Sequence, residues 1–111
     1  MSKSVMIVCG NTDDMLWLVR SLSGICVILV CASYESALSA QTKHRPDLVI
    51  IGDVQGGSGT ALVEQFYQQK NLVINVSEKT SCCGAMHVPL SDPDFNIKVL
   101  KLVHELLGEP T

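Results

Sequence analysis

RPDLVIIGDVQGG, residues 45–57, is the stretch from which the fold can be worked out. Its centre, Leu48–Ile51, is short, uncharged and aliphatic, and it lacks the two-residue alternation of a strand with one face in water. The Gly and Asp residues that follow it are typical of turns and loops. The stretch therefore predicts a strand buried on both faces that runs into a loop.

Three more apolar runs have the same character and are also predicted as strands buried on both faces: Val5–Cys9, Ile25–Cys31 and Leu72–Val76. Between and after the strands lie four segments with helical signals: Thr12–Ser23, Tyr34–His44, Gly59–Gln69 and Pro93–Leu107. In the last of these, Asp92 is predicted to cap the first amides, with Pro93 at the first helical position. Alternating buried strands and helices predict a parallel sheet covered by crossover helices.

The composition restricts the class of protein. A chain of 111 residues predicts a single domain, 1–111, which needs neither metal nor disulfides for its stability. The longest apolar run is too short to cross a bilayer and the first residues lack the pattern of a signal peptide, so we expect no membrane association and a cytoplasmic location. The net charge is -3, and the eight Lys and Arg residues form no cluster along the sequence. Both features argue against nucleic-acid binding. The odd number of cysteines, five, predicts reduced thiols.

Two segments resemble the response-regulator receiver (CheY-like) family. SYESALSAQTKHRPDLVII, residues 33–51, is similar to that family's second helix and third strand, and SDPDFNIKVLKLV, residues 91–103, is similar to its last helix. The resemblance extends over nearly the whole chain. It implies a flavodoxin-like, doubly wound α/β fold with five parallel strands in the order 2-1-3-4-5.

Receivers move a phosphoryl group from a kinase histidine to an aspartate that ends the third strand. The transfer needs Mg²⁺, held by carboxylates after the first strand, and a lysine after the fifth strand. By the resemblance, the acidic pair corresponds to Cys9 and Gly10, with Asn11 next, the phosphoacceptor to Gly52 and the lysine to Val88. We therefore predict a degenerate phosphorylation pocket in a pseudo-receiver with no metal, no cofactor and no catalytic activity. It would act as a phosphorylation-independent protein-interaction module in two-component or phosphorelay signalling.

Two residues keep a link to the family's chemistry. Ser77 matches the hydroxyl residue that follows the fourth strand in receivers. Asp53 supports the alternative of an unusual phosphorylatable receiver, because a bulge of one residue would bring its carboxylate to the acceptor position. Without a bulge, a shift of one residue turns the side chain to the opposite face of the sheet.

Only seven residues, EKTSCCG, separate Ser77 from Ala85, where receivers have a fourth helix. We expect this helix to be shortened or missing, and residues 85–88 to form a strained, displaced or antiparallel edge strand. The uncovered apolar surface near Leu72–Val88 is expected to bind a protein partner of a signalling pathway or a second copy of the chain, as a homodimer.

The cysteines support rival hypotheses. Cys82 and Cys83 lie in a predicted loop, where exposure favours a redox-sensing thiol. Together with His87 they form an incomplete zinc set whose spacing fits no common pattern. Cys9 resembles the phosphorylated cysteine of sugar-transport IIB proteins and small tyrosine phosphatases, but carboxylates at positions 13 and 14 would repel a phosphate there.

Trp17 points away from the apolar stripe of the first predicted helix, which includes Leu18 and Leu22. Partial exposure is therefore predicted for this side chain. It either lies on neighbouring side chains or serves as a binding anchor at an interface.

Overall fold

The computed structural model describes residues 3–9, 16, 19–22, 24, 26–52, 59–76, 86–88 and 92–107. Its strands are β1 (Ser4–Val8), β2 (Val27–Cys31), β3 (Leu48–Ile51), β4 (Leu72–Asn75) and β5 (Met86–His87). Its helices are α2 (Tyr34–His44), α3 (Gly59–Gln68) and α4 (Phe95–Leu107). Residues 16 and 19–22 are helical as well, within the first predicted helix.

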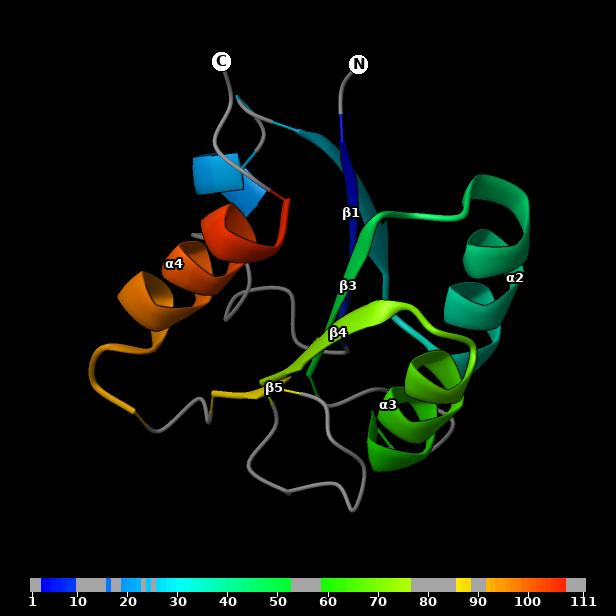
Figure 1. Cartoon of the computed structure of the whole chain (residues 1–111). Coiled ribbons are helices and arrows are strands. Elements are labelled where there is room, and N and C mark those ends of the chain that lie inside the picture. Colours follow the sequence, from blue (N-terminus) through cyan, green and yellow to red (C-terminus); the bar gives the residue numbers. More distant parts are fainter. Residues whose placement is uncertain are drawn as a thin grey trace.

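The strands form one parallel sheet in the order β2-β1-β3-β4-β5 (Figure 1). This order confirms the predicted flavodoxin-like topology. The antiparallel alternative for the fifth strand is wrong, because Ile74 pairs with Met86 and Asn75 with His87 in parallel register. The prediction of a shortened or missing fourth helix falls on residues 77–85, which lie outside the described residues.

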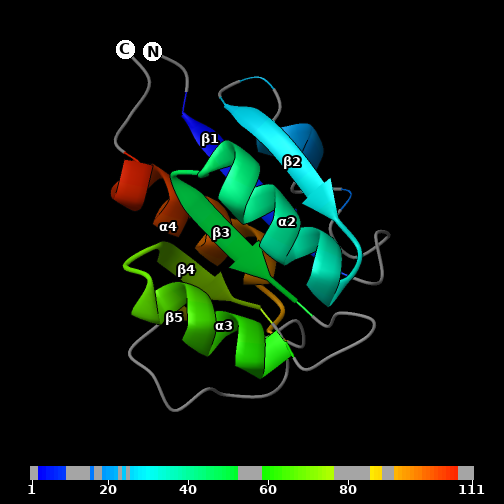
Figure 2. The same ribbon diagram turned by 90° about the vertical axis from the view of Figure 1, so that its right-hand side faces the viewer.

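Helices cover both faces of the sheet. Figures 1 and 2 show α2 and α3 on one side and α4 on the other, beside the helical residues 19–22. Because successive side chains of a strand point to opposite faces, β1 sends Val5 and Ile7 towards α4, and Met6 and Val8 towards α2 and α3. All four side chains are fully buried, so each face has its own apolar cluster.

The prediction that all four apolar runs are buried on both faces is wrong for β2. Val27 and Val30 are 52% and 51% exposed, whereas the residues of β3 are fully buried. The cause is the strand order: β3 lies in the middle of the sheet, and β2 lies at its edge, where neighbours cover only one side.

Side-chain hydrogen bonds lie at the starts of helices α2 and α4. Ser33 caps α2, because its Oγ accepts a hydrogen bond from the amide of Ser36 at 3.2 Å. Asp92 caps α4 as predicted: its Oδ1 accepts from the amide of Asp94 at 2.9 Å. The helix itself begins at Phe95, two residues later than the predicted start at Pro93.

Candidate functional site

The carboxyl ends of four neighbouring strands place Cys9, Gly52, Val76 and Val88 side by side, each directly after its strand. We call these four residues the carboxyl-end row. Backbone hydrogen bonds continue the sheet through the row: Gly52 N to Val8 O at 2.8 Å, Val76 N to Ile51 O at 2.8 Å and Val88 N to Asn75 O at 2.9 Å. In doubly wound folds, ligands bind at this edge of the sheet.

The carboxyl-end row is buried and uncharged. Cys9 is 2% exposed, Val76 is fully buried and Val88 is 5% exposed, and all three belong to the apolar cluster on the α4 side. Gly52 is also buried. An ionised side chain that is buried loses its hydration. The described residues of the row supply no charge of their own and contribute packing to the apolar cluster.

The structure brings together three of the predicted pocket residues, Cys9, Gly52 and Val88, at this edge. The other predicted pocket residues lie outside the described residues: Gly10, Asn11, Asp53 and Ser77. The pairing of β1 with β3 is regular from Val5–Leu48 to Val8–Ile51, and the amide of Gly52 continues it. The described part of β3 therefore contains no bulge before position 53.

Sequence reasoning missed two residues at this edge. Val76 completes the carboxyl-end row, although the receiver pattern assigns no chemistry to it. Asn75 is buried to 1% exposure and pairs in register with His87, which is half-buried. The available signal was a single polar residue inside the apolar run LVINV, residues 72–76.

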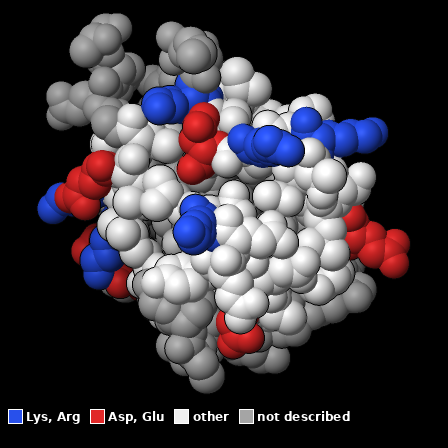
Figure 3. Space-filling model, turned by 45° about the vertical axis from the view of Figure 1, so that its right-hand side comes forward, with Lys and Arg blue, Asp and Glu red and all other residues white. Residues whose placement is uncertain are grey.

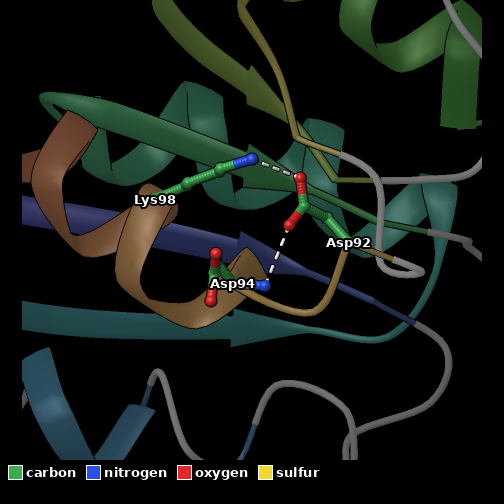
Figure 4. Close-up of polar contacts among 3 residues, drawn as sticks. All are labelled: Asp92, Asp94 and Lys98. Carbon is green, nitrogen blue, oxygen red and sulfur yellow. Dashed lines mark hydrogen bonds and ion pairs between the residues drawn. The ribbon is translucent and has the colours of Figure 1, made fainter.

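A lysine does follow the fifth strand, but it is already paired. Lys98 Nζ donates to Asp92 Oδ2 at 2.5 Å, in the first turns of α4 (Figure 4). The hydrogen bond from Lys98 and that from the Asp94 amide lower the pKa of Asp92, and the bond to Asp92 raises the pKa of Lys98. This ammonium group therefore pairs with a carboxylate at the start of α4.

Other cations lie at the end of the sheet where the strands begin. Lys3, Arg45 and Lys70 come shortly before β1, β3 and β4, and the last two adopt the left-handed backbone conformation, with φ of 45° and 67°. Figure 3 shows blue side chains along the upper rim of the molecule and a broad area below them with few charges. In a parallel sheet the starts of the strands are far from the carboxyl-end row.

The described cysteines form no disulfide: Cys9 and Cys31 are buried and Cys26 is half-buried. Burial raises the pKa of Cys26 and of Cys31, which disfavours the nucleophilic thiolate. The described residues contain no group of His, Cys, Asp and Glu side chains that could hold a metal ion. Cys82, Cys83 and Trp17 lie outside the described residues, so the hypotheses on them remain predictions.

An apolar surface lies at the β4 and β5 edge. Leu72 is 42% and Met86 40% exposed. Because Ile74 is the register partner of Met86, Leu72 is a diagonal neighbour of Met86 on the same face of the sheet.

Among the described helices, none has the length and apolar character that a membrane-spanning helix needs.

No family model and no curated protein sequence matches this chain. Solved structures do match it. The response regulator DrrB of Thermotoga maritima aligns with a TM-score of 0.81 at 14% identity over 96% of this chain and 53% of DrrB. The BeF3-activated receiver domain of DrrB aligns with a TM-score of 0.80 at 14% identity over 98% of this chain and all of that domain.

A CheY-like receiver domain protein from Methanospirillum hungatei aligns with a TM-score of 0.76 at 16% identity, over 96% of this chain and 94% of that one. The chain thus spans about half of the full DrrB regulator and nearly the whole of isolated receiver domains. It has the fold of the response-regulator receiver (CheY-like) domains.

Proposed function

We propose that residues 1–111 form a pseudo-receiver, a single receiver-like domain that acts as a phosphorylation-independent protein-interaction module in signal transduction. The observation that supports this proposal is the buried, uncharged carboxyl-end row in a receiver fold. Phosphoryl transfer needs a carboxylate nucleophile, and Mg²⁺ and a cation that neutralise the phosphoryl oxygens. No such group stands at Cys9, Gly52 or Val88, and we propose neither catalysis nor a cofactor.

The partners that we propose are proteins of a signalling pathway. The exposed Leu72 and Met86 support one contact surface at the β4 and β5 edge, because neighbouring exposed apolar side chains commonly mark interaction sites. We propose no binding to nucleic acid or membranes. The cytoplasmic location stays a prediction from the sequence.

The test is to incubate the chain with acetyl phosphate and Mg²⁺ and to measure its intact mass. The receiver domain of DrrB, treated in parallel, is the positive control. We expect no gain of a phosphoryl group on this chain. A phosphoryl adduct that the Asp53→Asn variant loses would contradict the proposal and establish the alternative of a phosphorylatable receiver.

A second measurement uses beryllofluoride, a phosphate mimic, with Mg²⁺. A ligand that binds only the folded state raises the melting temperature. We expect the melting temperature of this chain to stay unchanged while that of the DrrB receiver domain rises. An increase for this chain would contradict the proposal.

The thiol alternative needs its own experiment. The chain is treated with mild peroxide and weighed intact beside a variant with Cys82→Ser and Cys83→Ser. We expect no difference in oxygen uptake between the two proteins. Rapid oxidation of the unaltered chain, but not of the variant, would favour a redox sensor.

A further inference from the structure

The outer edge of β2 is uncharged along its whole length. Residues 21–34 contain no charged side chain and no proline. The register of β2 with β1 is unbroken from Ser4–Val27 to Val8–Cys31, so the strand contains no bulge. Natural edge strands are usually protected from further pairing by Lys, Pro, a bulge or a covering segment. β2 has no Lys, Pro or bulge, and no described segment pairs with its outer edge.

Backbone groups of β2 point outwards from this edge. On the inner side, Val27 N donates to Lys3 O at 2.8 Å, and Cys31 O accepts from Cys9 N at 3.0 Å. In a parallel ladder, alternate residues direct their backbone groups to the same neighbour. The amides and carbonyls of Ile28 and Val30 therefore face away from β1, and no described strand pairs with them.

Apolar side chains are exposed on both faces of this edge. Val27 and Val30 lie on opposite faces, and each is about half exposed, at 52% and 51%. Figure 2 shows β2 along one border of the sheet. An added strand would cover both valines and pair the outward backbone groups. The other border is less suitable, because β5 is only two residues long, against five in β2.

We propose that β2 pairs in antiparallel orientation with β2 of a second copy of the chain, across a two-fold axis at Leu29. In this register, Ile28 lies opposite Val30 of the second copy, and the two residues exchange backbone hydrogen bonds. On the other face, Val27 lies opposite Cys31 of the second copy. The result is one continuous ten-stranded sheet.

The chemistry of the strand favours a second copy over an unrelated peptide. The pairing is self-complementary, as a two-fold interface requires. The absence of charge between residues 21 and 34 leaves nothing to select a charged peptide or to repel an identical strand. Because one pair of short strands makes a small interface, the dimer should be weak and depend on concentration.

Sedimentation velocity over a range of protein concentrations tests this proposal. We expect the unaltered chain to dimerise as its concentration rises, and Val30→Lys to weaken dimerisation about tenfold, because each copy loses an apolar cross-strand pair. Tyr67→Lys is the control: it places the same charge on a half-exposed side chain of α3, a helix that packs against β3 and β4. Circular dichroism checks that both variants are folded.

A crosslink tests the register without any change of charge. Leu29→Cys places two thiols directly opposite each other across the axis, at a distance that a disulfide can span. Mild oxidation should yield a dimer whose peptide map joins the two introduced cysteines, and Ile28→Cys should yield much less of the corresponding crosslink. A chain that remains monomeric at high concentration would overturn the proposal. A dimer that Tyr67→Lys disrupts and Val30→Lys leaves intact would overturn it as well.

Discussion

The two ends of the same sheet differ in chemistry. Where the strands begin, polar groups hold the chain: Asp47 Oδ2 accepts from Ser4 N at 2.8 Å, and Asp47 N donates to Ser4 O at 2.9 Å. Where the strands end, the carboxyl-end row packs into an apolar cluster. Backbone pairing is present at both ends, but among the described residues only the starting end adds a charged side chain, Asp47, to that pairing. The receiver fold therefore does not depend on charged side chains at Cys9, Gly52 or Val88.

The largest expected effect comes from a carboxylate in the carboxyl-end row. Cys9→Asp would place an ionised group at a position that is 2% exposed and belongs to the apolar cluster on the α4 side. We expect the free energy of unfolding at pH 7 to fall by about 3 kcal/mol, measured by urea denaturation. Burial would raise the pKa of this carboxyl group above its unfolded value, so the deficit should shrink as the pH falls.

The matched control is Cys9→Ala, which removes the sulfur without adding a charge and should cost about 1 kcal/mol. If Cys9→Asp proved as stable as Cys9→Ala and gained stability from Mg²⁺, the two ends of the sheet would not differ as described. The row would then be close to a working metal site, and the proposed loss of phosphotransfer would need revision.

The fold was largely predictable because its signals are local. Leu48–Ile51 is an apolar run without alternation, and its residues are fully buried. The same pattern misled at β2, because a run of Val, Ile and Leu does not reveal whether a strand lies inside a sheet or at its edge. That depends on strand order, which is set by contacts between distant segments. The direction of β5 likewise depends on the path of the chain after β4.

The candidate site was only partly predictable. The receiver pattern pointed to Cys9, Gly52 and Val88, and the structure places them together. It did not point to Val76, which lies between Gly52 and Val88 in the order of the strands, or to the buried Asn75. Their roles follow from the register of β4 with its neighbours, which a pattern of residue types along one chain does not contain.

A smaller effect is expected where the strands begin. Asp47→Ala removes the carboxylate that accepts from the Ser4 amide, and it should lower the free energy of unfolding by about 1 kcal/mol. Ser4→Ala is the control: it keeps this amide and removes the hydroxyl group, which donates to Asp47 Oδ2 at 3.4 Å and accepts from Asp47 N at 3.3 Å. Its loss in urea denaturation should be clearly smaller. Equal losses would show that the hydroxyl group, and not the amide, holds the two strands together.

The smallest effect is expected at the start of α4, where a single carboxylate both caps the helix and pairs with a lysine. Hydrogen bonds from Lys98 and from the Asp94 amide lower the pKa of Asp92 below its ordinary value. Its charge therefore stabilises the folded state fully above pH about 4, and this contribution is lost as the pH falls through the lower, folded-state pKa. Asp92→Asn keeps an oxygen for the cap but loses the charge.

The melting temperature of Asp92→Asn should therefore be lower than that of the unaltered chain by a constant amount from pH about 5 to about 7, and the gap should close in stronger acid. Asp92→Ala loses the cap as well, so its deficit should persist at low pH. Lys98 cannot cause an acid-dependent change, because its raised pKa means that its own contribution is lost only in alkali. A gap for Asp92→Asn that stayed constant down to pH about 2 would show that the stabilisation comes from the cap geometry and not from the charge.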